Sequence, residues 1–317
     1  MPVRRRRPRK GASLSFGRRG PFRIVQFTDT HLSHPRPQDR RTQALLGSVL
    51  DVEQPDLVVL TGDIVSGWET PDAAAAWATA VAPMVERGIR WAAVLGNHDD
   101  EGALRRAQLV EVQRGWPGCL TQAGPVDIGG AGNYVLPILD RQGRQPAALL
   151  YFLDSGGYSP TGVGHYAWFT HEQVGWYRET SNAWTRRIGR PLPALAFFHI
   201  PLPEFDTAWR EGSDKRGARN EPVCAPVINS GMFAAFHECG DVVGVFVGHD
   251  HVNDFEANLH GIRLCYGRAS GYGAYGRPGF ARGARVIELT PGLRDFATRV
   301  RLAPGRPTRA VVRPARP

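Results

Sequence analysis

The tetrapeptide Gly96-Asn97-His98-Asp99 decides the fold, because it directly follows an apolar run at residues 91–95. It places an amide, an imidazole and a carboxylate where a buried strand is predicted to end. Glycine and asparagine also occur in ordinary turns, so this stretch alone does not distinguish a site from a loop. The other apolar runs of the chain decide between the two.

Four further apolar runs, at residues 22–27, 57–60, 195–198 and 242–247, end in the same kind of polar cluster. They are followed in turn by Asp29 and His31, by Gly62-Asp63, by His199, and by Gly248-His249-Asp250-His251. Short apolar runs without strict alternation are typical of strands buried on both faces. Since ligands collect at the carboxyl ends of such strands, we predict an α/β protein with one site at five strand ends.

These clusters contain seven candidate metal ligands: Asp29, His31, Asp63, Asn97, His199, His249 and His251. Carboxylate, imidazole and amide donors without cysteine favour Mn, Fe, Zn or Co. Seven ligands exceed the four of a tetrahedral ion, which predicts two divalent or trivalent ions bridged by a carboxylate. Two ions about 3.5–4 Å apart clamp the attacking and leaving oxygens of a phosphoryl displacement. The predicted chemistry is phosphoester hydrolysis.

The order D-x-H, G-D, G-N-H-D, a lone His and G-H-x-H resembles the calcineurin-like metallophosphoesterase superfamily, and the likeness extends from residue 22 to about 289. The wording between the motifs, such as Phe197-Phe198-His199-Ile200-Pro201, is similar to a purple-acid-phosphatase-like branch with a yeast cell-cycle phosphatase and plant members. The resemblance implies a four-layer α/β/β/α sandwich of two mixed sheets, with a dinuclear metal site at the carboxyl ends of the strands.

The resemblance also implies a role for each residue. The first metal ion would be held by Asp29, His31 and His251, the second by Asn97, His199 and His249, and Asp63 would bridge the two. His98 would face the substrate and stabilise the transition state or protonate the leaving group, while Asp99 would orient His98. The nucleophile would be a metal-bound hydroxide, since coordination lowers the pKa of water to about 7.

One position departs from the pattern of true purple acid phosphatases. Those enzymes carry a metal-binding Tyr three residues after the bridging Asp, where this chain has Ser66, and they lack a histidine at the position of His31. The resemblance therefore implies a site without the purple iron–tyrosinate colour. Some members of the branch that lack this Tyr are labelled inactive, but the full ligand set predicts an active hydrolase here.

The sequence leaves the substrate open. The leading prediction is a phosphomonoesterase, with phosphoproteins among its substrates. A phosphodiesterase acting on cyclic nucleotides, phospholipid headgroups or nucleic acid is the alternative, because superfamily members with the same ligands cleave these compounds. A non-catalytic metal-binding scaffold is a third hypothesis. A monoesterase should bury a terminal phosphate against cationic groups, whereas a diesterase should leave a second exit past His98.

The basic charge of the chain lies at its ends. The formal net charge is +9, but the two ends together carry about +14, so the body carries about −5. We predict a disordered basic tail at 1–20, a metallophosphoesterase domain at 21–290 and a Pro- and Arg-rich tail at 291–317. Nucleic acid could contact the tails, but the acidic body does not favour it as a partner.

The remaining sequence features concern the location of the protein and its secondary structure. No apolar signal core or membrane-length run is present, and the four scattered cysteines suit free thiols, so we expect a cytoplasmic protein without a membrane partner. Helices are predicted at 40–53, 71–86, 101–114, 170–184 and 226–239, and further strands at 149–153, 262–266 and 286–289. Loops at 205–222 and 267–279 are expected to shape the pocket.

Overall fold

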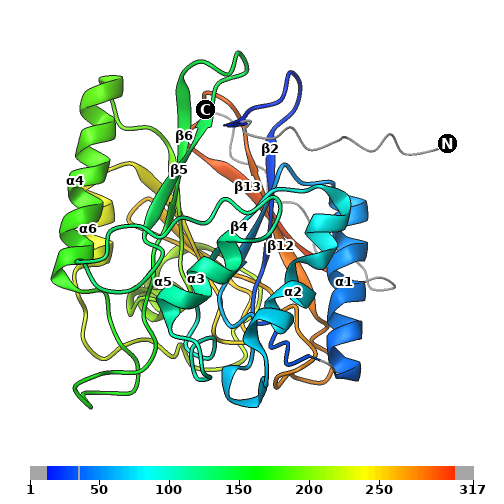
Figure 1. Ribbon diagram of the computed structural model, residues 1–317. Helices are drawn as coiled ribbons and strands as arrows, with labels where there is room; N and C mark the ends of the chain where they lie inside the picture. Colours follow the sequence, from blue (N-terminus) through cyan, green and yellow to red (C-terminus); the bar gives the residue numbers. More distant parts are fainter. Residues whose placement is uncertain (1–12, 35, 304–317) are drawn as a thin grey trace.

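The computed structural model describes residues 13–34 and 36–303. Two mixed sheets lie face to face, and helices cover the outer face of each (Figure 1). One group of helices, which includes α4 and α6, lies against one sheet, and a second group, which includes α1 and α2, lies against the other. The four-layer sandwich predicted from the sequence is therefore confirmed.

The larger sheet has eight strands in the order β1-β5-β6-β7-β9-β11-β10-β8. Neighbouring strands are parallel from β6 through β7 and β9 to β11, and β10 and β8 continue the sheet antiparallel. The strands are β1 (Leu14–Ser15), β5 (Tyr134–Leu139), β6 (Pro146–Phe152), β7 (Ala194–Phe197), β8 (Ser213–Arg216), β9 (Val242–Val247), β10 (Glu256–Leu259) and β11 (Ile262–Tyr266). The parallel centre brings the carboxyl ends of β7 and β9 to one edge.

The smaller sheet has five strands in the order β13-β12-β2-β3-β4. Its strands are β2 (Phe22–Phe27), β3 (Leu57–Thr61), β4 (Trp91–Val94), β12 (Gly283–Leu289) and β13 (Phe296–Leu302). Strands β2, β3 and β4 are parallel to one another, so their carboxyl ends also share one edge. The five strands predicted to deliver site residues are thus the parallel centres of the two sheets.

Six α-helices cover the sheets in the described part of the chain. The smaller sheet packs against α1 (Pro37–Glu53), α2 (Ala73–Arg87) and α3 (Arg106–Arg114), and the larger against α4 (His171–Ile188), α5 (Glu204–Glu211) and α6 (Met232–Cys239). A short 3₁₀ turn, η1 (Gly67–Glu69), follows β3. No helix in residues 13–34 and 36–303 is long and apolar enough to span a membrane. The four cysteines are free, as predicted.

A core of aromatic and aliphatic side chains separates the two sheets. Phe22 and Leu57 of the smaller sheet join Phe152, Phe197 and Phe246 of the larger one in this layer. Phe197 stacks against Phe152 at 5.4 Å and against Phe246 at 5.3 Å between ring centroids. Each buried side chain of this kind contributes about 1.5–3 kcal/mol. Because helices cover the other face of the same strands, the runs show no polar alternation in the sequence.

The predicted loop at 205–222 is wrong, because it contains α5 and β8. Phe205 and Ala208 of α5 are fully buried one helical turn apart, but charged neighbours hide this pattern in the sequence. All four residues of β8 are exposed, and the strand pairs only with β10 at the sheet edge, so it carries no apolar signal.

Both predicted domain boundaries lie inside the fold. Residues 296–302, which we assigned to the carboxy-terminal tail, form β13, and each of these seven residues pairs with a residue of β12. Leu14 pairs with Ile138 of β5, and Phe16 is buried, although both were assigned to the basic tail. Arg299 and Arg301 mask the alternation of β13 in the sequence, yet both pair with the buried Glu53. Residues 1–12 and 304–317 of the predicted tails lie outside the described residues.

We predict that Asp241 stabilises the packing of α4 against the larger sheet. Its buried carboxylate accepts hydrogen bonds from the hydroxyls of Tyr151, Tyr177 and Ser181. Asp241→Ala would leave three buried hydroxyls without this acceptor and should cost about 3 kcal/mol or more of unfolding free energy, measured by urea denaturation. Tyr177→Phe should cost about 1–2 kcal/mol, and Asp127→Ala, at an exposed position, less than about 0.5 kcal/mol. Equal midpoints for Asp241→Ala and Asp127→Ala would contradict this role.

Candidate metal centre

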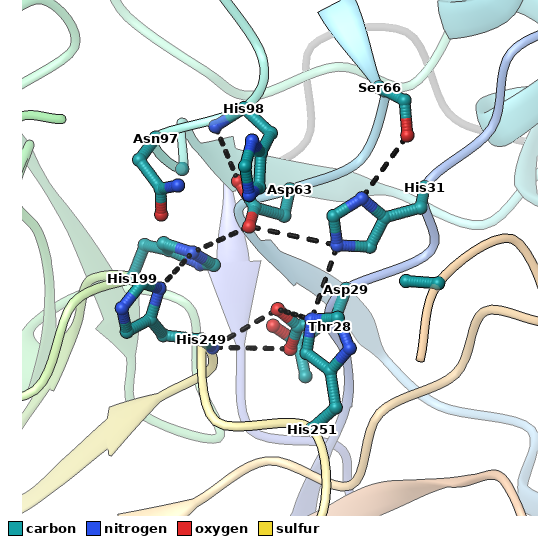
Figure 2. Close-up of polar contacts among 12 residues, drawn as sticks. Thr28, Asp29, His31, Asp63, Ser66, Asn97, His98, His199, His249 and His251 are labelled. Atoms are coloured by element: carbon teal, nitrogen blue, oxygen red, sulfur yellow. Dashed lines mark hydrogen bonds and ion pairs between the residues drawn. The ribbon is translucent and has the colours of Figure 1, made fainter. Parts of the chain in front are cut away.

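Loops at the carboxyl ends of five strands bring the seven predicted ligands together (Figure 2). The loops follow β2, β3 and β4 of the smaller sheet and β7 and β9 of the larger one. All seven side chains are buried, and none is more than 8% exposed. Buried carboxylates and imidazoles are rare unless they are paired or bind a metal, so this cluster requires a chemical explanation.

The candidate ligands form two groups that share Asp63. The donor atoms of Asp29, His31, Asp63 and His251 lie within 4.8 Å of one another, and so do those of Asp63, His199 and His249. The Asp63 carboxylate lies 3.1 Å from His199 Nε2 and 3.7 Å from His31 Nε2. A single carboxylate therefore faces both groups, as a bridging ligand must.

Several buried imidazole nitrogens face one another across the centre. His31 Nε2 lies 3.2 Å from His251 Nε2, and His199 Nε2 lies 3.3 Å from His249 Nδ1. Within the described residues, Asn97 Oδ1 and His249 Nε2 are buried without any hydrogen-bond partner. A cation between these atoms would satisfy them. The residues therefore fit a pair of metal ions.

Hydrogen bonds at the far side of three rings fix which nitrogen faces the centre. His199 Nδ1 donates to the Thr61 carbonyl at 2.8 Å, and His251 Nδ1 donates to the Tyr275 carbonyl at 3.1 Å. In each ring Nε2 is therefore the nitrogen that faces a carboxylate of the centre. His31 Nδ1 lies 3.2 Å from the hydroxyl of Ser66, so the residue found in place of the family's tyrosine positions the neighbouring imidazole.

The pKa values of the four imidazoles are shifted in opposite directions, two upward and two downward. Burial opposes protonation of His199, but the carboxylate of Asp63 outweighs it and raises the pKa of His199 to about 9. Burial, reinforced by His199, lowers the pKa of His249 to about 3. Burial likewise lowers the pKa of His31 to about 3, whereas the pKa of His251 is raised because its nearest carboxylate outweighs burial. In each pair of facing rings the pKa of one imidazole is thus raised and that of the other is lowered, and a metal cation would compete with protons for these nitrogens.

The backbone of the ligand loops is strained. Asp29, His31, Asp63 and His249 have φ values of 53°, 46°, 49° and 79°. Aspartate and histidine adopt this left-handed region more readily than most residues, yet the conformation still costs about 1–3 kcal/mol at each position. Four of seven candidate ligands share it. Such strain clusters where a rigid fold holds side chains in a functional arrangement.

Glycines allow the loops to approach one another closely. A Cβ atom on Gly62 would lie 2.6 Å from His199 Nδ1, and one on Gly96 would lie 2.1 Å from Asp63 Oδ1. A Cβ atom on Gly248 would lie 2.0 Å from Thr28 Oγ1. The glycines of the G-D, G-N-H-D and G-H-x-H motifs are therefore required because ligands occupy the space where a side chain would begin.

Asp99 does not orient His98, contrary to the sequence expectation. Its buried carboxylate accepts backbone N–H bonds from Asp63, Ile64, Val65 and Gly96, at 2.7–3.0 Å. Burial, with the nearby charge of Asp63, raises the pKa of Asp99 to about 6. Asp99 therefore ties the loop after β4 to the loop after β3. Both carboxylate oxygens of Asp99 bond to backbone N–H groups of these loops, and the side chain does not contact the imidazole of His98.

Glu101 takes the place beside His98 that we expected for Asp99. Its carboxylate lies 2.7 Å from His98 Nδ1 and also accepts the hydroxyl of Tyr158 at 2.8 Å. Trp68 packs edge-on against the His98 ring, with centroids 4.8 Å apart. Sequence reasoning missed Trp68, Glu101 and Tyr158. The position of Glu101 three residues after His98 was the available signal for Glu101, whereas Trp68, in η1, and Tyr158, in a loop, belong to no motif.

Two tyrosines cover imidazoles of the centre. Tyr275, in the predicted pocket loop 267–279, stacks on His251 with centroids 4.1 Å apart and planes 13° apart. Tyr166 lies edge-on to His249 at 4.4 Å, and sequence reasoning did not identify it. His34, three residues after His31, lies with its Nδ1 2.8 Å from the hydroxyl of Thr79 in α2. The mouth of the site is therefore largely aromatic.

Known proteins share both the sequence and the fold. A protein of Arabidopsis thaliana named "Probable inactive purple acid phosphatase 14" is 38% identical over 317 residues, covering 87% of this chain and 79% of the plant protein. Phosphatase DCR2 of Saccharomyces cerevisiae is 37% identical over 280 residues, covering 78% of this chain but 48% of the yeast protein. These relatives confirm the branch that the motifs resemble.

Solved structures confirm the fold at lower identity. A dimetal phosphatase from Danio rerio superposes with a TM-score of 0.63 at 14% identity, covering 90% of this chain and 96% of that one. A purple acid phosphatase from yellow lupin gives a TM-score of 0.52 at 14% identity, covering 91% of this chain and 52% of that one. Residues 22–253 match the calcineurin-like phosphoesterase family, and with these relatives they show that the chain belongs to it.

Proposed function

We propose that this chain is a dinuclear-metal-dependent phosphoester hydrolase that acts on phosphomonoesters. The observation that carries the proposal is the pair of buried donor groups that meet on the Asp63 carboxylate. The first ion would bind Asp29, His31 and His251, and the second Asn97, His199 and His249. Two bound ions would supply charge stabilisation for the phosphoryl group and an activated water. The similarity to a yeast protein named as a phosphatase supports the monoesterase form.

His98 is suited to act on the substrate. Its backbone N–H donates to Asp63 Oδ1 at 2.8 Å, which places the residue beside the bridging carboxylate. Its side chain is 27% exposed, in contrast to the buried candidate ligands. Glu101 occupies Nδ1, so Nε2 is available to a leaving-group oxygen. We propose that His98 protonates or hydrogen-bonds this oxygen and that Glu101 holds the ring.

Phosphodiester hydrolysis is the second candidate, and the surroundings of His98 favour it. In the described part of the chain the side chains that contact the His98 ring are His31, Trp68, Glu101 and Tyr158. None of these is Arg or Lys, and Trp68 is 54% exposed. A diester carries one negative charge fewer than a monoester dianion, so it needs less cationic neutralisation at this point.

Elemental analysis coupled to hydrolysis assays tests the proposal. The purified protein should contain two metal ions per chain and should hydrolyse p-nitrophenyl phosphate when Mn, Fe, Zn or Co is supplied. Faster turnover of bis-p-nitrophenyl phosphate would contradict the monoesterase proposal and support a phosphodiesterase. Two bound ions without turnover of either compound would contradict hydrolysis of simple esters and favour a scaffold.

We predict that Asp63→Ala removes both ions, because both donor groups lose the carboxylate that they share. Inductively coupled plasma mass spectrometry should detect less than about 0.2 metal ions per chain after dialysis, since loss of a bridging ligand typically weakens binding far more than the 10–100-fold of an indirect partner. Asp127→Ala, at an exposed carboxylate, should retain the wild-type content. Full occupancy in Asp63→Ala would refute the bridging role.

We predict that His98→Ala lowers kcat about 100- to 10,000-fold while metal content stays near the wild-type value. Glu101→Gln should give a smaller decrease, because the amide still occupies the position of the carboxylate without its charge. His171→Ala, on the exposed surface of α4, is the matched control and should turn over normally. If His98→Ala lost its metal ions, His98 would be a ligand and the proposed role would fail.

A further inference from the structure

A second cavity lies next to the pocket loop 267–279, outside the seven candidate ligands. Its volume is about 420 Å³, within the range of about 300–1,000 Å³ that is typical of small-molecule sites. Its walls come from α1, from residues 272–282 and from the end of β13. The principal lining residues are Arg41, Tyr272, Arg277, Phe280, Arg282 and Ala303.

Three guanidinium groups line this cavity, and the described residues pair none of them with a carboxylate. Arg282 is only 8% exposed, and its Nη2 donates to the backbone carbonyls of Ala274 at 2.9 Å and Tyr275 at 2.7 Å. Arg41 lies over the Tyr272 ring at 4.1 Å, and Arg277 donates to an amide oxygen at 3.2 Å. All these partners are neutral.

Other buried arginines of the molecule have acidic partners. Arg106 pairs with Asp154, Arg268 with Asp254, and Arg285 with Glu256. A buried cation is costly unless it is paired, and burial accordingly lowers the pKa of Arg282. The charge of Asp29 opposes this effect without forming an ion pair with Arg282. Among the described residues, the arginines of the cavity therefore have no carboxylate in direct contact, and Arg282 is the buried one of the three.

The sequence has no acidic residue in its two end segments outside the described residues. Residues 304–317, which follow Ala303 in the sequence, contain four arginines and no aspartate or glutamate. Residues 1–12 likewise contain arginines and a lysine but no acidic side chain. Neither segment therefore offers an acidic side chain to the arginines of the cavity.

We propose that this cavity binds a phosphate group through Arg41, Arg277 and Arg282. Guanidinium groups form charge-assisted, often bidentate hydrogen bonds with phosphate oxygens. A dianion with several acceptor oxygens can bind three guanidiniums that approach from different elements, whereas a carboxylate has two oxygens and one charge. Gly276 keeps the guanidinium accessible, since a Cβ atom there would lie 2.9 Å from Arg282 Nη2.

One backbone carbonyl oxygen links the cavity to the metal centre. The carbonyl oxygen of Tyr275 accepts hydrogen bonds both from Arg282 Nη2, at 2.7 Å, and from His251 Nδ1, at 3.1 Å. The ligand has two possible sources, a second phosphate on the substrate or free phosphate. The first source rests on the proposed function, whereas phosphate binding itself does not.

Equilibrium dialysis with ³²P-labelled inorganic phosphate tests the proposal on the full-length, metal-loaded protein. Wild type should bind phosphate at two sites, at the metal centre and in the cavity. Arg41→Gln/Arg277→Gln should weaken one of them at least about tenfold, because two charge-assisted contacts are lost. Metal content and hydrolysis of p-nitrophenyl phosphate should not change. Arg282→Gln should weaken the same site, and this second variant tests the buried guanidinium directly.

Arg144→Gln/Arg186→Gln is the matched control, because it removes the same charge from exposed positions. It should bind phosphate as wild type does. The proposal is overturned if wild type has no second site, or if the control loses affinity as much as the cavity variants. Because dialysis does not require turnover, an inactive protein that binds phosphate in the cavity would refute the proposed function and leave this inference standing.

Displacement of the labelled phosphate distinguishes the two sources. If a substrate's second phosphate occupies the cavity, fructose 1,6-bisphosphate should displace the label at least about tenfold more tightly than fructose 6-phosphate. Arg41→Gln/Arg277→Gln should abolish this advantage. Equal displacement by the two sugars in wild type would identify free phosphate as the ligand of the cavity.

Discussion

The position of the Asp63 carboxylate is the constraint on which the rest of the site depends. One oxygen accepts the backbone N–H of His98, and the other lies 3.1 Å from His199 Nε2. The carboxylate therefore joins a loop of the smaller sheet to a loop of the larger one. Its own backbone is left-handed, and Gly96 must lack a side chain to make room for it. Two sheets with separate outer cores thus meet at one charged group, and a pair of cations would fit among the nitrogen and oxygen atoms around it.

A set of hydrogen bonds outside the metal centre maintains this arrangement. Asp99 holds four backbone N–H groups of the two loops after β3 and β4, and Arg106 donates to the carbonyls of Leu95 and Gly96 while it pairs with Asp154. These contacts supply the rigidity that strained ligand loops need, because left-handed backbone persists only where its surroundings determine it. The acidic residue of G-N-H-D is thus a structural member of the site.

The clustering of the candidate ligands was predictable because each follows a buried strand, where an apolar run and a polar cluster are contiguous in the sequence. What could not be predicted depends on contacts between distant segments. The direction of the Asp99 side chain follows from the loop that packs on it. Trp68 reaches His98 from the short turn η1 and Tyr158 from a loop, and neither segment has a periodic pattern. Strand β13 was missed because its outward arginines resemble a basic tail until the buried Glu53 is placed beside them.

The distribution of charge around the two cavities bears on substrate choice. The mouth near His98 is aromatic and acidic, whereas the arginines lie on the other side of Tyr275. A substrate phosphate at the metal centre would depend on the ions for neutralisation, while a second anionic group would find its cations in the adjacent cavity. The Tyr275 carbonyl holds both His251 and Arg282, so a shift of this loop on anion binding would act on a candidate metal ligand without crossing the protein core.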